Sequence, residues 1–330
     1  MSDWFDQIVK VELHLHLEGA IPMDALWVLI QKYGGDASVP TREALAGKFQ
    51  YSDFPHFIET WVWKNGFLRE YEDFAWIAEA VARDLARQNI IYAEAFFSPA
   101  DFFRFGLTTQ KLAESLRIGL SRVPEIEVAL VADLVRDFGP VRAEQTLFEV
   151  NEARGLGVIG VTIGGSEQDF PPELFEGVFE KARGLGFHTS AHAGEASGPE
   201  SVWKALQSLR VERIGHGTRA QEDEALVGYL AEHRIPLEMC PVSNVRTKVV
   251  DSIEVHPIRR FYERGIPVTV NTDDPALFGN SLAGELRLLE SRLGFSREEI
   301  QDVLYQAVHA SWLSDEKKKN LILKCRSQHL

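Results

Sequence analysis

Four short segments, far apart along the chain, carry residue types that bind a metal ion and move protons. They are His14-Leu15-His16, His192-Ala193-Gly194-Glu195, Gly215-His216-Gly217 and Thr272-Asp273-Asp274-Pro275. Three imidazoles and one carboxylate suit a divalent transition metal such as zinc. Glu195, His216 and Asp274 would then remain, and residues of these types activate water and transfer protons. The combination indicates a metal-dependent hydrolase.

The spacing of the histidines supports one shared site. His14 and His16 are two residues apart, so on a β-strand both side chains point to the same side and can chelate one ion. His192 and His216 follow later apolar runs in the same way. Because the active sites of α/β barrels form at the carboxyl ends of the strands, we expect these side chains to meet there.

Each remaining motif also has a purely structural interpretation. Glu195 would fit a helix N-terminus, where the helix dipole favours a carboxylate. His216, between two glycines, would fit a turn, and Asp-Asp-Pro is common in loops. Asp273 and Asp274 are neighbours, and neighbours on a strand point opposite ways. One of them can therefore be a ligand while the other faces a substrate.

Eight short, mostly apolar runs predict the strands that would position these residues. They cover residues 10–16, 90–97, 127–133, 157–163, 187–192, 212–215, 235–240 and 267–272. Amphipathic segments that predict helices lie between most of them, at 108–123, 143–153, 172–182, 199–209 and 222–233. Strands that alternate with helices in this way predict a (β/α)8 TIM barrel.

Two segments are longer than a (β/α)8 barrel requires. Residues 19–89 are too many for one crossover, and they carry Phe54, Phe57, Trp61, Trp63, Phe67, Phe74 and Trp76. We expect extra helices there, packed over one end of the barrel, with aromatics that form either a lid or a local core. Three helical stretches follow the last strand. No linker interrupts the sequence, so we expect residues 1–330 to form one domain.

Composition limits the partners and the compartment. The net charge of the 330 residues is −14, which argues against binding to a nucleic-acid backbone. Two distant cysteines, Cys240 and Cys325, form no disulfide framework, which favours the cytoplasm. The N-terminus lacks the features of a signal peptide, and no apolar run is long enough to predict a membrane span.

Other catalytic and cofactor motifs do not fit. Residues 155–160 match GxGxxG by letter, but they end a predicted helix and open a strand, which is the reverse of the dinucleotide-binding arrangement. The sequence contains no HExxH and no GxSxG. The HxE…PCxxC signature of zinc-dependent nucleobase deaminases is also missing.

The segments resemble, in order and spacing, the motifs of the adenosine deaminase family of the amidohydrolase superfamily. The matching stretches are residues 10–21, 192–195, 215–217, Cys240-Pro241-Val242-Ser243-Asn244 and Asn271-Thr272-Asp273-Asp274-Pro275. The resemblance spans nearly the whole chain. It implies a zinc-bearing (β/α)8 barrel that hydrolyses the 6-amino group of a purine and releases ammonia.

The resemblance also implies a role for each residue. The ligands of one zinc ion would be His14, His16, His192 and Asp273, with His16 also on the substrate side. Glu195 would protonate ring N1 as a metal-bound hydroxide attacks C6. His216 would take the proton of the water and steady the oxyanion. Asp274 would contact the attacking water and accept from purine N7, and the N–H of Gly165 would donate to N3.

The group at purine N9 is where this sequence departs from the best-known members. Glu18 stands where an aspartate usually contacts the ribose 5′-hydroxyl, as in the adenine deaminase branch. Gly164-Gly165-Ser166-Glu167 replaces the usual Ala-Gly-Asp-Glu, whereas Gly215 before His216 resembles the nucleoside enzymes. We expect a 6-aminopurine nucleoside such as adenosine as the substrate. The alternatives are adenine and aminodeoxyfutalosine, an intermediate of an alternative menaquinone route.

Two functions of other kinds fit less well. A purine-binding module without activity would have little reason to keep every metal and catalytic position filled. A barrel hydrolase of another amide-like bond would not need Glu195, His216 and Asp274, a set that suits attack on a purine ring.

Overall fold

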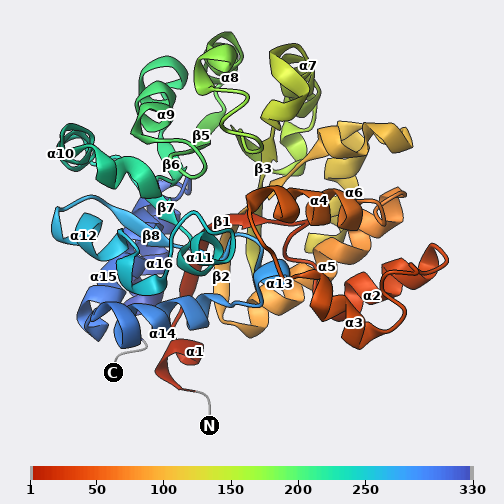
Figure 1. Cartoon of the computed structure of the whole chain (residues 1–330), viewed down its shortest axis with the longest axis horizontal. Helices are drawn as coiled ribbons and strands as arrows, with labels where there is room; N and C mark the ends of the chain where they lie inside the picture. Colours follow the sequence, from red (N-terminus) through yellow and green to blue (C-terminus); the bar gives the residue numbers. More distant parts are fainter. Residues whose placement is uncertain (1–2, 328–330) are drawn as a thin grey trace.

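The computed structural model describes residues 3–327 and shows a barrel of eight parallel strands in the order of the chain (Figure 1). The strands are β1 (Lys10–His16), β2 (Ile90–Phe97), β3 (Glu127–Asp133), β4 (Val158–Thr162), β5 (His188–Ala193), β6 (Arg213–His216), β7 (Leu237–Met239) and β8 (Val268–Val270). The residues after β8 close the barrel onto β1, because the N–H of His16 donates to Asp273 O at 3.0 Å and that of Asp273 to His14 O at 3.1 Å. The predicted (β/α)8 fold is confirmed.

The last two strands are shorter than predicted, and prolines explain part of the difference. Pro236 and Pro267 have no N–H for the sheet, so β7 and β8 begin after them. The N–H of Ile235 caps the preceding helix instead, donating to Leu230 O at 3.0 Å. At the other end, Cys240 is the N-cap of a helix rather than part of β7.

The barrel helices are α6 (Thr109–Leu120), α7 (Gly139–Glu152), α8 (Glu176–Gly184), α9 (Pro199–Lys204), α10 (Glu224–Glu232), α11 (Pro241–Arg246) and α12 (Ile258–Glu263). Helices α6 to α10 lie within or close to the predicted segments, whereas α11 and α12 lie where no segment was predicted. Two predicted helices are divided: residues 172–175 form a 3₁₀ turn before α8, and residues 205–209 form a π turn after α9. Further 3₁₀ turns are η1 (Pro99–Phe105), η2 (Arg136–Phe138), η3 (Arg154–Leu156), η6 (Thr218–Glu222) and η7 (Ile253–Val255).

The extra helices lie where the sequence predicted them. A short α1 (Trp4–Gln7) precedes the barrel, and α2 (Met23–Lys32), α3 (Arg42–Lys48), α4 (Phe54–Asn65) and α5 (Tyr71–Arg87) connect β1 to β2. After β8 come a four-residue helix, α13 (Pro275–Phe278), and the three longer helices expected, α14 (Leu282–Leu293), α15 (Arg297–Ala310) and α16 (Asp315–Ser327). Of the described helices, none is long and apolar enough to cross a membrane.

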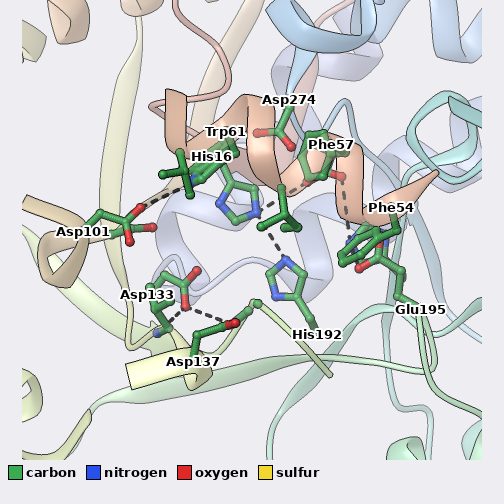
Figure 2. Close-up of a pocket in the computed structure, with 18 of the residues that line it drawn as sticks. His16, Phe54, Phe57, Trp61, Asp101, Asp133, Asp137, His192, Glu195 and Asp274 are labelled. Atoms are coloured by element: carbon green, nitrogen blue, oxygen red, sulfur yellow. Dashed lines mark hydrogen bonds and ion pairs between the residues drawn. The ribbon is translucent and has the colours of Figure 1, made fainter. Parts of the chain in front are cut away.

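Aromatic residues of the 54–76 segment contribute to the core and to the pocket, and Phe57 contributes to both. Phe57, Phe67 and Phe74 are buried in the hydrophobic core. Phe54 and Trp61 of α4, together with Phe57, border the pocket at the mouth of the barrel (Figure 2). Helix α4 therefore supplies one wall of this pocket as well as core contacts.

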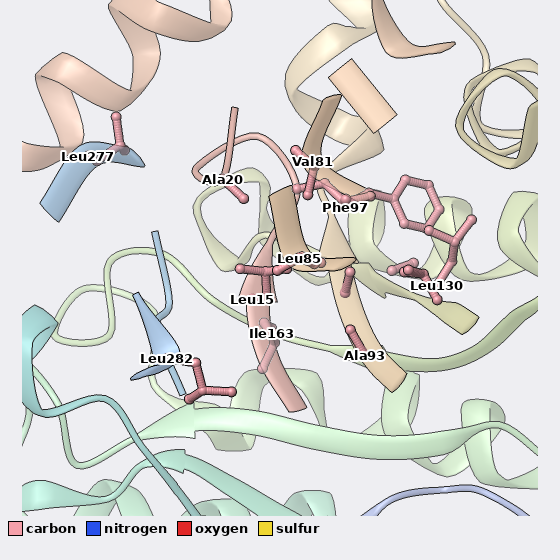
Figure 3. Packing of buried hydrophobic residues seen from close by; sticks show 14 of the residues in the cluster. Leu15, Ala20, Val81, Leu85, Ala93, Phe97, Leu130, Ile163, Leu277 and Leu282 are labelled. Carbon is pink, nitrogen blue, oxygen red and sulfur yellow. The ribbon is translucent and has the colours of Figure 1, made fainter. Parts of the chain in front are cut away.

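The alternation of β1 separates an apolar outside from a charged inside. Leu13 and Leu15 are fully buried among apolar residues, and Leu15 belongs to the large core cluster that includes Val81 and Leu85 of α5 (Figure 3). On the other face, Glu12 and His14 are also fully buried. The side chains that fill the barrel interior are therefore partly ionisable, and each needs a polar partner there.

Candidate metal centre and active site

Four of the predicted residues converge at the carboxyl ends of the strands. The ligand atoms of His14, His16, His192 and Asp273 all lie within 4.8 Å of one another, and all four side chains are buried. The Nε2 atoms of His14 and His16 are each 3.4 Å from Asp273 Oδ1, and His16 Nε2 is 3.2 Å from His192 Nε2. Nε2 of His14 has no hydrogen-bond partner. Three imidazoles and a carboxylate this close together form a ligand set that suits zinc.

The backbone around this centre is held in an uncommon conformation. His216 and Asp273 have φ angles of 60° and 65°, in the left-handed region that residues other than glycine rarely adopt. Such strain is concentrated at functional sites in proteins. Gly215 is required for packing, since a Cβ atom there would lie 2.8 Å from Cε1 of His14.

A buried carboxylate fixes the orientation of His14. Its Nδ1 lies 2.8 Å from Oε2 of Glu238, and Oε1 of Glu238 accepts from Nε of Arg213 at 2.6 Å. Arg213 is also ion-paired with Glu94 at 2.7 Å. A carboxylate at Nδ1 places the histidine proton there and leaves the Nε2 lone pair for a metal. Asp273 is held similarly, because the hydroxyl of Ser243 donates to its Oδ2 at 2.6 Å.

The loop that carries Glu195 is organised by a single carboxylate. Glu167 accepts hydrogen bonds from the backbone N–H groups of Gly194, Glu195, Ala196 and Ser197 at 2.6–3.1 Å. Burial, and then the charges of Asp273 and Glu167, raise the pKa of Glu195 well above its ordinary value. Glu195 is thereby suited to hold a proton at neutral pH and donate it.

His216 has a defined tautomer. The N–H of Ile258 donates to Nδ1 of His256 at 3.3 Å, so the proton of neutral His256 lies on Nε2 and is donated to Oδ1 of Asn244. The amide nitrogen of Asn244 then faces Nδ1 of His216 at 3.0 Å and donates to it. Neutral His216 therefore carries its proton on Nε2, which lies 3.6 Å from Oε2 of Glu195.

Asp274 lies beside the metal centre with an oxygen available. It is buried, and its Oδ1 has no hydrogen-bond partner. A Cβ atom on Gly19 would lie 1.6 Å from this oxygen, so the glycine allows the close approach. Burial and the neighbouring charge of Asp273 raise the pKa of Asp274 well above its ordinary value.

A cavity of about 190 Å³ connects these groups to the mouth of the barrel. Its lining includes His16, His192 and Asp273 of the candidate metal centre, together with Glu195, His216, Asp274 and Gly165. Figure 2 shows His16, His192, Glu195 and Asp274 around the cavity. The N–H of Gly165 has no hydrogen-bond acceptor among residues 3–327, so it is free to donate to a bound molecule. Glu18 lies behind the wall: it is 1% exposed and accepts from the N–H of Ser98, which does line the cavity.

Comparison with known proteins agrees with this geometry. The model of the adenosine deaminase family matches residues 9–327. This chain belongs to the adenosine deaminase family. Among curated members, it is 36% identical to the aminodeoxyfutalosine deaminase of Streptomyces coelicolor over 311 residues, covering 92% of this chain and 80% of that one. It is equally 36% identical to the adenine deaminase of Bordetella avium over 302 residues, covering 91% and 95%.

One of the similar solved structures contains a metal ion. An amidohydrolase from Burkholderia ambifaria with bound Zn superimposes with a TM-score of 0.90 at 27% identity, covering 98% of this chain and 91% of that one. The family and the geometry together make this protein a deaminase-type hydrolase that acts on purine-type compounds.

The sequence patterns predicted no role for three residues that support this site, which are Glu238, Asn244 and Glu167. Glu238 has a signal that could have revealed it, because a lone carboxylate inside a buried apolar strand requires a partner. Asn244 and Glu167 both occur in motifs quoted above, but their partners are distant in sequence. Only the folded chain shows that they hold His216 and the Glu195 loop.

Proposed function

We propose that this protein is a zinc-dependent deaminase that hydrolyses the 6-amino group of a purine nucleoside, as in the conversion of adenosine to inosine and ammonia. The observation that carries the proposal is the extent of the cavity. Its lining includes Glu195, Asp274 and Gly165 and also Phe138 and Asp101. Figure 2 shows Asp101 and Glu195 on opposite sides of His16 and His192. A free base would leave the outer part empty, whereas a base with a sugar would occupy it.

The side chains can handle the protons of this reaction. Glu195, with its raised pKa, donates a proton to ring N1 and makes C6 more electrophilic. His216 presents Nε2–H and steadies negative charge on the oxygen that attacks C6. This tautomer suits a donor better than a base, so of the two roles that the family resemblance implies for His216 we favour the stabilising one.

Asp274 and Gly165 orient the reactants. The unpartnered Oδ1 of Asp274 accepts a hydrogen bond from the attacking water. Purine N7 has no hydrogen in a nucleoside, so towards N7 Asp274 would be the donor rather than the acceptor, as its raised pKa allows. The free N–H of Gly165 donates to purine N3. Both groups are fixed by their surroundings, so the ring is held in one pose before reaction.

We propose that one zinc ion is held by His14, His16, His192 and Asp273. Zinc at such a site lowers the pKa of a bound water to about 7 and so supplies a nucleophile at neutral pH. Glu238 and Ser243 keep two of the four ligands in place.

Two other substrates have support from named relatives. The similarity to an aminodeoxyfutalosine deaminase and to an adenine deaminase is the same, 36%. The position of Glu18 behind Ser98 removes it from direct contact with the cavity, so its size alone does not exclude a sugar.

The test is the release of ammonia by zinc-loaded protein from adenosine, adenine, AMP and aminodeoxyfutalosine at equal concentrations. We expect the highest kcat/KM with adenosine. Preference for aminodeoxyfutalosine or adenine would retain the mechanism and change the substrate, and release from none of the four would contradict the proposed function.

A further inference from the structure

The outer part of the cavity is acidic. Asp101, Asp133 and Asp137 line it together, beside the aromatic ring of Phe138. Figure 2 shows the three carboxylates on one side of His16 and His192, with Glu195 on the other side. They do not serve the metal centre, and nothing in the proposed reaction uses them.

Their hydrogen bonds leave acceptor capacity facing the cavity. Oδ2 of Asp101 accepts from Trp61 at 3.2 Å and from Asn65 at 3.0 Å, and Oδ1 of Asp133 accepts two backbone N–H groups at 2.9 Å. The second oxygen of each has no donor among residues 3–327. Asp137 accepts from the N–H and the hydroxyl of Ser166.

No cationic side chain of the described residues lines the cavity beside them. Among the described residues that line it there is no lysine or arginine. Two buried cations lie outside the lining and donate elsewhere: Arg136 to backbone carbonyls, including His192 O at 2.7 Å, and Lys64 to Glu18 O at 2.5 Å. Their charges still lower the pKa values of Asp133 and Asp101, respectively, so they offset part of the negative charge from behind the wall. Burial raises the pKa of Asp133 to about 6, which leaves this carboxyl largely ionised at pH 7.5.

We infer that Asp101, Asp133 and Asp137 select the charge of the group at the sugar end of the substrate, admitting hydroxyl or amine donors and excluding a 5′-phosphate. The inference rests on the proposed function, because it assumes a nucleoside with its purine at the metal centre. A carboxylate can only accept hydrogen bonds, so it pairs with hydroxyl or ammonium groups. A phosphate in the same place would be repelled and would find no cationic partner.

The test measures binding rather than turnover, so that the two proposals can fail separately. Calorimetry with zinc-loaded protein at pH 7.5 would compare inosine, IMP and the neutral, similarly bulky 5′-O-sulfamoylinosine. We expect IMP to bind at least about 30-fold more weakly than inosine, and the sulfamoyl compound to bind within about fivefold of inosine. A repulsion between unit charges at about 4 Å in water corresponds to roughly fivefold in Kd, and three carboxylates act together.

Variants identify the residues responsible. In Asp137→Asn and in Asp101→Asn the ratio of the IMP and inosine Kd values should fall by about fivefold. Asp169→Asn is the matched control, since Asp169 is exposed, lies on the β4–α8 connection and does not line the cavity. In Asp169→Asn, the ratio of the IMP and inosine Kd values should equal that of the parent protein. Two variants of different burial keep the test valid if one of them fails to fold.

Three results would overturn the inference: IMP binding as tightly as inosine, exclusion of the sulfamoyl compound as strong as that of IMP, or an unchanged ratio in both variants. Failure of both inosine and IMP to bind would overturn it as well. Turnover of adenosine by the same preparation decides the proposed function independently. Loss of turnover with the binding ratio intact would contradict the deaminase and leave the charge selection standing.

Discussion

Nδ1 of His14 and Oε2 of Glu238 lie 2.8 Å apart in the interior of the barrel, where both side chains are fully buried. Glu238 is ion-paired with Arg213, and Arg213 is ion-paired with Glu94. A chain of alternating charges therefore leads from the metal centre into the barrel. Because each buried charge has a partner, the arrangement fixes the imidazole of His14 without leaving an isolated ion.

The first prediction is that Glu238→Gln weakens zinc binding by about 10- to 100-fold, because a neutral amide orients His14 less firmly and leaves Arg213 with one counter-charge fewer. Competition with a chromogenic chelator measures the affinity. Glu232→Gln, an exposed change of the same kind, is the control. An unchanged zinc affinity in Glu238→Gln would show that the pair does not support the site.

Replacement of Glu195 by glutamine separates catalysis from metal binding. The amide cannot donate a proton to the purine, so kcat should fall by about 100- to 10,000-fold. Glu195 is not among the residues whose ligand atoms cluster at the metal centre, so the zinc content measured by atomic absorption should match that of the parent. Turnover near the parent rate would remove Glu195 from the mechanism.

Asn244→Asp tests the tautomer of His216. An ionised aspartate would accept a hydrogen bond from Nδ1 of His216, whereas the amide of Asn244 donates one to it. Neutral His216 would then carry its proton on Nδ1 and not on Nε2. If Nε2–H stabilises the attacking oxygen, kcat should fall by about a hundredfold with zinc retained. A kcat that is kept or increased would instead indicate that Nε2 acts as a base. Asn320→Asp, at an exposed position of α16, controls for the added charge.

The charge of Glu167 should be visible in the pH profile. Glu195 must be protonated to act, and its pKa is raised, so kcat/KM should hold at neutral pH and fall as the pH rises through that pKa. Glu167→Gln removes one of the charges that raise it. The decrease of kcat/KM at alkaline pH should therefore occur at lower pH in this variant. A decrease at the same or a higher pH would contradict its assignment to Glu195.

The barrel and the convergence of the proposed metal ligands could be predicted because their signals are local. Apolar runs mark the strands, and the family motifs place His14, His16, His192 and Asp273 at strand ends, where the fold brings them within 4.8 Å of one another. The errors occurred at the ends of elements. Prolines shortened β7 and β8, and hydrogen-bonded turns interrupted two helices, which are effects of single residues that a pattern of hydrophobicity does not register.

The supporting residues could not be predicted, because their roles depend on contacts across the barrel. Glu167 reaches a loop 27 to 30 residues away, and Asn244 reaches His216 across 28 residues. Glu18 shows the converse case. Its place in the motif predicts a contact with substrate, whereas the fold turns its carboxylate towards the N–H of Ser98. A direct role for Glu18 in substrate binding stays a prediction.

The most direct test of the central claim is a metal-dependent assay with adenosine. Inosine and ammonia would be quantified for the zinc-loaded protein, for the protein after removal of metal with a chelator, and after zinc is restored. We expect equal amounts of inosine and ammonia from the zinc-loaded protein, neither product after removal of the metal, and recovery of both when zinc is restored. Undiminished turnover by the metal-free protein, or no turnover of adenosine by the loaded protein, would contradict it.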